Sequence, residues 1–233
     1  PKYNAYELNE FQNGTTPYIY PNVDWVNEVF KDNGYSNNYN IGIRGGGTKM
    51  RYFTQINLLS NDGFMKNPET NNGYSTQYKY SKANFRTNLD IDLGPLTKVE
   101  INLLGNIAEH NRPGRSISTL FDNLYTIPSA AYPVKTKDNI WGGSPTWPTT
   151  NPVAGVQATG WGKSHARTVF ADMKLIQKLD FITPGLSSAI RGGIDSYADF
   201  WEGLSATYVY ASDRLTFING APDQTIRTTG GQI

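Results

Sequence analysis

Cysteine is absent from this chain of 233 residues, and only 2 histidines occur in it. Without cysteine the chain forms no disulfide, and it has no thiolate to act as a nucleophile or a metal ligand. The lack of cysteine also means that this residue cannot indicate the redox compartment. We expect no cofactor and no metal ion.

Long apolar runs are missing as well. Because no stretch of about 18 apolar residues occurs, membrane-spanning helices are excluded, and any membrane assignment must rest on strands. The formal net charge of +1 does not suggest a nucleic-acid partner. Aromatic residues, in contrast, make up 13 % of the chain. Transmembrane barrels have this bias, since their lumen and loops are polar while Tyr and Trp gather at the bilayer edges.

The segment from Ser81 to Leu93 alternates between apolar or small residues and polar or charged ones. A β-strand between two opposite environments produces this pattern. At about 3.3 Å per residue the segment spans on the order of 43 Å, which is enough to cross a bilayer. We expect its polar side chains to line a wet lumen: Lys82, Asn84, Arg86, Asn88, Asp90 and Asp92.

Similar alternation predicts further strands along the chain, at residues 39–46, 50–60, 97–109, 167–182, 186–201 and 206–218. A short helix is predicted at 118–127, with Ser118 as its cap and Pro128 as its stop. Short turns at 46–49, 94–97 and 183–185 alternate with long connections, so all short turns are expected at one side. This asymmetry is typical of outer-membrane barrels. The sequence therefore predicts an all-β fold, part of a large antiparallel transmembrane β-barrel with long extracellular loops.

Three blocks of sequence resemble a known family. They are YPNVDW at 20–25 followed by VFK at 29–31, GGGTKMRYF at 45–53 and NFRTNLDID at 84–92. In order and spacing they resemble the SusC/RagA-type TonB-dependent outer-membrane transporters. The resemblance is specific over residues 1 to 110 and rests on strand pattern beyond them.

The resemblance implies a 22-stranded barrel in a Gram-negative outer membrane, in contact with its lipid. It also implies an N-terminal plug, energy supplied by a TonB complex, and a SusD-like surface lipoprotein as a lid. The implied activity is import of oligosaccharides or oligopeptides, without catalysis. Residues 1–22 would be the end of the plug and its connection, 24–31 the first strand, and 23–233 the early barrel strands. Extracellular loops are then expected at about 61–77, 110–165 and 202–205.

The chain shows neither a signal peptide before Pro1 nor a TonB-box, and residues 228–233 look like a loop. We therefore expect an internal piece of a longer protein.

Five aromatic residues stand in the long connection among Gly, Pro, Thr and Asn. They are Tyr125, Tyr132, Trp141, Trp147 and Trp161. Exposed rings of this kind stack on sugar or peptide surfaces or contact a lid protein. The alternative is that they pack the loop onto itself or anchor it at the bilayer edge. The sequence leaves both readings open.

Catalytic and metal-binding interpretations are weaker. Asp90 and Asp92 share one strand face, which favours lumen-facing carboxylates over a glycosidase pair. His110 and His165 would face each other if the strands that carry them pair, but no further ligand with recognisable spacing completes a metal site. The rival to the transporter is a soluble all-β carbohydrate-binding module, which would bury Phe85, Leu89 and Ile91 instead of turning them to lipid.

Overall fold

The computed structural model describes residues 3–69 and 73–231. Its helices are α1 (Ala5–Asn13), α2 (Trp25–Val29), α3 (Ile117–Thr126) and α4 (Pro152–Gln157). Its strands are β1 (Ser36–Gly46), β2 (Met50–Asn61), β3 (Lys79–Asp92), β4 (Thr97–Pro113), β5 (Trp141–Gly142), β6 (Gly160–Lys178), β7 (Ser187–Ser205), β8 (Tyr210–Ile218) and β9 (Ala221–Gly230).

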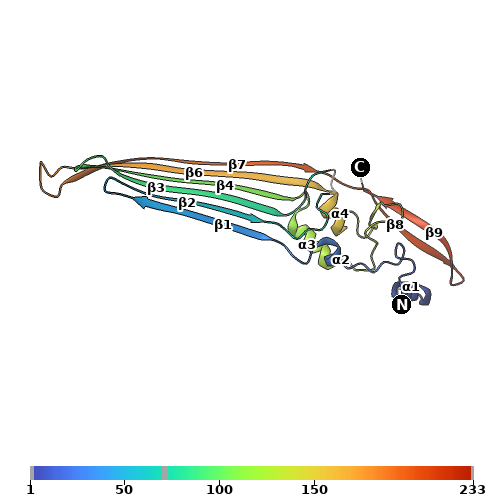
Figure 1. Cartoon of the computed structure of the whole chain (residues 1–233). Coiled ribbons are helices and arrows are strands. Elements are labelled where there is room, and N and C mark those ends of the chain that lie inside the picture. The colour runs from blue at the N-terminus through green and yellow to red at the C-terminus, as the bar shows by residue number, and fades with distance from the viewer. Residues whose placement is uncertain (1–2, 70–72, 232–233) are drawn as a thin grey trace.

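Most of the structure is one long antiparallel sheet with the strand order β1-β2-β3-β4-β6-β7 (Figure 1). A smaller sheet, β5-β8-β9, lies near the helices at one end. The mainly β fold and the antiparallel sheet confirm the coarse prediction. Among the described residues β1 and β7 do not pair with each other, so they form no closed barrel.

The connections differ between the two ends of the large sheet. At one end β1–β2 and β3–β4 are joined by short turns, as expected (Figure 1). β6–β7 are joined at the same end by a longer connection than expected, residues 179–186, because β6 ends at Lys178 and not at residue 182. Backbone hydrogen bonds close these turns, for example from Gly47 to Met50 at 2.7 Å and from Leu93 to Thr97 at 2.9 Å. At the other end lie the longer connections and the helices. We call these the turn end and the loop end.

Several strands run further toward the loop end than predicted. β4 continues to Pro113 and β6 begins at Gly160, so the connection expected at 110–165 is shorter at both sides. Residues 202–205 are not a loop, because pairing of β6 with β7 continues to Gly160 and Ser205. In the connection expected at 61–77, residues 70–72 lie outside the described part of the chain.

The first predicted strand, 24–31, is wrong, because this segment forms α2. The Asp24 carboxylate caps the helix by accepting a hydrogen bond from the Asn27 backbone N–H at 3.0 Å. Trp25 and Val29, four residues apart, are both buried on one side of it. Only Phe30, in an isolated antiparallel bridge with Met65, keeps extended pairing. Capping by Asp24 and burial on one helical face therefore decide this segment, and the strand that the resemblance implied does not form.

The strand predicted at 206–218 is also misplaced. β8 pairs with β5 and β9 in the small sheet instead of continuing the large one. Asn219 and Gly220, with φ angles of 49° and 81°, form the turn into β9. Two successive positive φ angles are typical of a type I′ hairpin turn. β9 extends to Gly230, so the expected loop at 228–233 is wrong up to that residue, while 232–233 lie outside the described residues.

The segment assigned to the plug connection, 1–22, contains α1, and residues 1–2 lie outside the described part. Asn4 and Glu7 form a reciprocal capping box at its start. Gly14, with a φ angle of 64°, ends the helix. Local capping therefore accounts for both ends of α1.

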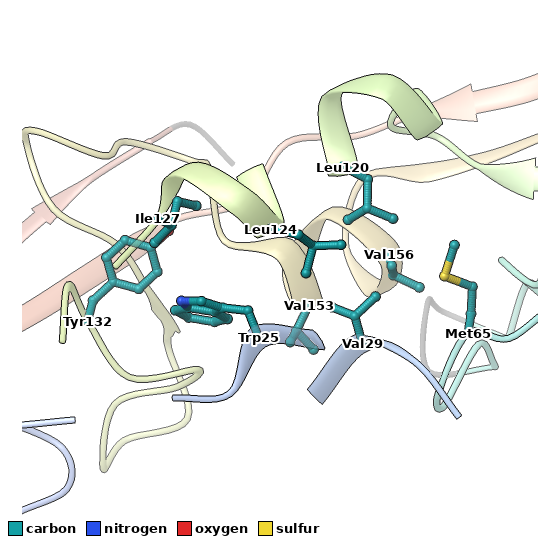
Figure 2. Packing of buried hydrophobic residues seen from close by; sticks show 9 residues of the cluster. All are labelled: Trp25, Val29, Met65, Leu120, Leu124, Ile127, Tyr132, Val153 and Val156. Atoms are coloured by element: carbon teal, nitrogen blue, oxygen red, sulfur yellow. The ribbon is translucent and has the colours of Figure 1, made fainter. Parts of the chain in front are cut away.

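The main hydrophobic core lies at the loop end and not under the sheet. Figure 2 shows it as a cluster from α2, α3, α4 and their connections. Its members are Trp25, Val29, Met65, Leu120, Leu124, Ile127, Tyr132, Val153 and Val156. The Trp25 indole donates a hydrogen bond to the Pro128 carbonyl at 3.3 Å, which fixes its position in this core. Residues from the start of the chain and from the long connection thus form one folded unit, which we call the cap.

Asn151 holds the cap together from within. Its side chain is fully buried, and its amide donates to the carbonyls of Val134 at 2.9 Å and Gly142 at 3.0 Å. Its oxygen accepts from the backbone N–H groups of Val153 at 3.1 Å and Ala154 at 3.2 Å, which caps α4. Four backbone groups depend on this one side chain.

Replacing Asn151 by Ala should therefore destabilise the cap by about 2–4 kcal/mol, because buried backbone groups lose their partners. Hydrogen exchange of the α4 amides measures this loss. Asn4→Ala removes another N-cap asparagine, from the exposed start of α1, and should leave α4 exchange unchanged. Equal α4 protection in the wild-type protein and Asn151→Ala would contradict the assigned role.

Candidate functional site

The six polar residues predicted to share one face of β3 do so. The strand pairing extends this face across the sheet, because residues directly opposite in an antiparallel ladder point to the same side. Asn84 lies opposite Asn57 and Asn106, and Asp90 opposite Arg51 and Glu100. We call this the polar face. Whether it borders a lumen stays a prediction.

Side chains on the polar face form hydrogen-bonded rows that cross the strands. Asn84 donates to Asn57 at 3.2 Å, and Asn57 donates to Asn38 at 2.7 Å. A second row starts at β3 and ends at β7. In it Asn88 donates to Asn102, Asn102 donates to Asp172 at 3.1 Å, and the Arg191 guanidinium donates to Asp172 at 3.1 Å. The face therefore satisfies much of its polarity laterally, within the sheet.

Near the turn end the polar face carries partly exposed ion pairs. The Lys98 ammonium lies 3.2 Å from Asp90 and 2.7 Å from Glu100. Arg51 is 4.0 Å from Asp90. Each partner retains solvent contact, so these pairs contribute little to stability individually. Their effect is to balance charge locally, which leaves this part of the face without a strong field of one sign.

The opposite face is apolar, and none of the described residues covers it. It is built from the alternate positions of all six strands of the large sheet. Its exposed members include Tyr39, Ile41, Ile43, Ile56, Leu58, Phe85, Ile107, Val169, Met173, Ile190 and Ile194. We call this the apolar face. Continuous apolar surfaces of this kind mark contact with a protein or with a membrane.

Charged side chains replace the apolar ones where this face reaches the loop end. The Glu109 carboxylate lies 3.1 Å from His165 and 3.9 Å from Lys163. His165 also lies 3.5 Å from Glu202. Two residues along β6 from His165, toward the turn end, the Arg167 guanidinium lies over the ring of Phe200, 5.1 Å from its centroid. The apolar face therefore has a sharp polar border on this side.

The two histidines do not face each other. β4 and β6 do pair, but the register sets His110 opposite Ser164 and His165 opposite Glu109. Because adjacent residues of a strand point to opposite faces, the two rings lie on different sides of the sheet. No group of three or more His, Asp or Glu side chains able to hold a metal ion occurs within residues 3–69 and 73–231.

Three of the loop aromatics pack within or against the cap. Tyr132 is 1 % exposed, and its hydroxyl lies 2.9 Å from that of Thr150. Burial raises the pKa of Tyr132 to about 12. Trp141 and Trp147 are partly buried against the core, and the Lys135 ammonium lies 4.3 Å from the Trp141 ring centroid. For these residues the packing alternative fits better than an exposed binding surface.

The remaining two lie elsewhere. Trp161, at the start of β6, stacks on Tyr74 with ring centroids 5.2 Å apart. Tyr125 is 79 % exposed on α3. Its ring stacks on Phe121, which in turn stacks on Phe30, with centroids 6.3 and 5.8 Å apart. Phe121 is not among the contact residues predicted from the sequence, although its position four residues before Tyr125 in a predicted helix is the signal for it.

None of the helices in the described residues is both long and apolar enough to cross a membrane. A scan against models of known protein families and a search of curated proteins both find no match for this chain.

Substitution separates the two kinds of loop aromatic. Tyr132→Ala should destabilise the cap by about 3–5 kcal/mol, because it empties a buried site. Tyr125→Ala should change cap stability by no more than about 0.5 kcal/mol, since the ring is mostly exposed. Limited proteolysis of residues 114–159 as a function of urea measures both values. If Tyr125→Ala proved as destabilising as Tyr132→Ala, Tyr125 would have a structural role and would not be a free contact residue.

Proposed function

We propose that this chain forms part of the wall of an outer-membrane importer of the SusC/RagA type. The observation that carries the proposal is the uncovered apolar face of the large sheet, which stands back to back with the polar face. A membrane wall needs this combination, with hydrocarbon on one side and water on the other. A soluble sheet of this size has its apolar face covered by another layer.

The dimensions of the apolar face support the proposal. On β4 it runs from Val99 to Ile107, which corresponds to about 26 Å along the strand at about 3.3 Å per residue. With a strand tilt of about 40°, the height along the membrane normal is about 20 Å, comparable with the apolar band of about 25 Å in outer-membrane barrels. The charged cluster around Glu109 then lies at the level of the lipid headgroups.

The two outer strands support the same proposal. In the described part of the chain, β1 and β7 each pair along one side only. Unpaired backbone groups are not tolerated in hydrocarbon, so a membrane wall requires further strands beside both edges. In the proposed importer these strands close the barrel, which the resemblance gives as 22-stranded.

The unequal ends of the sheet suggest an orientation. Outer-membrane barrels have short turns on the periplasmic side and long loops outside, so the cap would face the exterior. There the exposed Tyr125 and Phe121 would be available to a SusD-like lid or to an oligosaccharide or oligopeptide cargo. Energy would come from a TonB complex acting on a plug. The polar face binds and passes cargo, and no covalent chemistry is proposed.

A charge placed on either face tests the proposal. Ile194 on the apolar face and Tyr197 on the polar face are both 69 % exposed and both lie on β7. In the full-length importer, which supplies the strands beside both edges, Ile194→Arg should lower the free energy of unfolding in lipid vesicles by about 2–4 kcal/mol, and Tyr197→Arg should lower it by no more than about 1 kcal/mol. Urea titration of the vesicle-inserted protein gives both values.

A soluble carbohydrate-binding module would behave differently. The protein would then stay in solution without detergent, because its own residues would bury the apolar face. Tolerance of Ile194→Arg in vesicles would mean that this face meets water and not lipid. Either result would exclude the membrane wall. Loss of folding by both variants alike would also exclude it, since the two faces would then not differ in their surroundings.

A further inference from the structure

An apolar island interrupts the polar face near its middle. Leu104 on β4 and Phe170 on β6 lie directly opposite each other in the register. Both side chains are open to solvent, at 39 % and 44 % exposure. They form the floor of a hollow of about 470 Å³ between β3 and β7. This volume lies within the range of small-ligand sites, about 300–1,000 Å³.

The rim of the hollow carries two guanidinium groups. Arg86 lies directly opposite Leu104, and its Nε donates to the Asn88 side-chain oxygen at 3.2 Å. No carboxylate lies within ion-pair distance of Arg86 among the residues that the structure describes. On the far side Arg191 is paired with Asp172 at 3.1 Å. A second carboxylate, Asp195, lies directly opposite Phe170 on β7. The two guanidinium groups therefore balance two carboxylates, and the unpaired positive charge is confined to the Arg86 side of the hollow, where an anion can bind.

Two amides complete the rim. Asn88 and Asn102 are joined in the row that crosses the polar face, and each donates one N–H within it. A side-chain amide has two N–H groups and two acceptor positions, so each retains hydrogen-bonding capacity. Groups that both donate and accept complement hydroxyls, which do the same. The hollow thus combines an apolar floor, hydroxyl-matching amides and a cation without an anionic partner.

We infer that this hollow binds an acidic oligosaccharide, with the apolar face of a uronic-acid ring on Phe170 and its carboxylate on Arg86. Aromatic rings take up the apolar faces of sugars, and guanidinium pairs with carboxylates by two parallel hydrogen bonds. The view of this ligand as cargo rests on the proposed function, whereas the binding itself does not.

The position of the hollow favours a sugar over an acidic peptide. Extended peptides commonly bind by adding a strand to an open sheet edge. The floor of the hollow is instead formed by β4 and β6, which are paired on both sides. The peptide backbone would find no free ladder there, while ring hydroxyls find the amides of Asn88 and Asn102.

Calorimetry on the purified protein in detergent tests the inference with four probes. Tetragalacturonate should bind, and its affinity should fall as salt is raised from about 50 to about 500 mM. Its methyl ester, which has the same rings without the charge, should bind at least about tenfold more weakly, as should neutral maltotetraose. Tetraglutamate, an acidic peptide, should bind at least about tenfold more weakly as well.

Variants locate the site. Arg86→Gln should weaken tetragalacturonate binding about tenfold or more, with Arg86→Lys intermediate. Phe170→Ala should weaken it several-fold. Arg44→Gln makes the same change in charge on the same face, two strands away from Arg86, and should change affinity by less than about twofold. The circular dichroism spectrum and thermal midpoint of each variant show that it is folded.

Equal binding of the ester would overturn carboxylate recognition, and tighter binding of tetraglutamate would overturn the sugar. Absence of binding by every probe, or equal losses in Arg86→Gln and Arg44→Gln, would overturn the site. These failures are distinct from failure of the proposed function. A membrane-inserted protein that ignores tetragalacturonate refutes only this inference, and a detergent-independent protein that binds it refutes only the importer.

Discussion

The backbone ladder of the large sheet is the constraint on which the rest of the structure depends. Its register is unbroken from β1 to β7, so every side chain is assigned to one of two faces by its position alone. A slip of one residue would exchange the two environments completely. The length of the strands multiplies this effect, because each additional pair extends both faces together.

The two faces of the large sheet differ in how their side chains find favourable contacts. The polar face closes hydrogen bonds sideways, as in the row from Asn88 to Arg191, and so is internally consistent without a covering layer. The apolar face has no such solution and depends on what lies against it. Within the described residues the main dry core is the cap, which is built from helices and loops. The sheet is therefore held together by backbone pairing between its strands, and both of its faces stay available to contact their surroundings.

Period-two alternation made the large sheet predictable, and it located the polar side chains of β3 and the short turns. The strand at 24–31 was implied by the family resemblance and not by alternation, and it fails because other groups decide the local geometry. Asp24 caps a helix there, and the burial of Trp25 depends on residues more than 100 positions away. The Asn219-Gly220 pair is typical of a hairpin turn, but no strand is predicted after it, and residues 228–233 are expected to be a loop although β9 extends to Gly230.

The candidate site was predictable to a lesser extent. Side chains on one strand, such as Arg86 and Asn88, follow from alternation, but the partners Leu104, Phe170 and Arg191 depend on a register that no single strand encodes. Tyr132 and Tyr125 lie in the same connection with similar neighbours, yet one is buried and the other exposed. The difference arises from which side of the cap core each meets, a tertiary property.

The bond between Trp25 and the Pro128 carbonyl joins groups separated by 103 positions, and β1 to β4 lie entirely between them. A contact of such sequence separation closes late in folding, because the loop entropy is recovered only once the intervening strands have paired. The cap then holds the start of the chain against the connection after β4. Cleavage of the backbone between β2 and β3 would therefore leave the two pieces joined twice, by the pairing of β2 with β3 in the sheet and by the packing of both pieces in the cap.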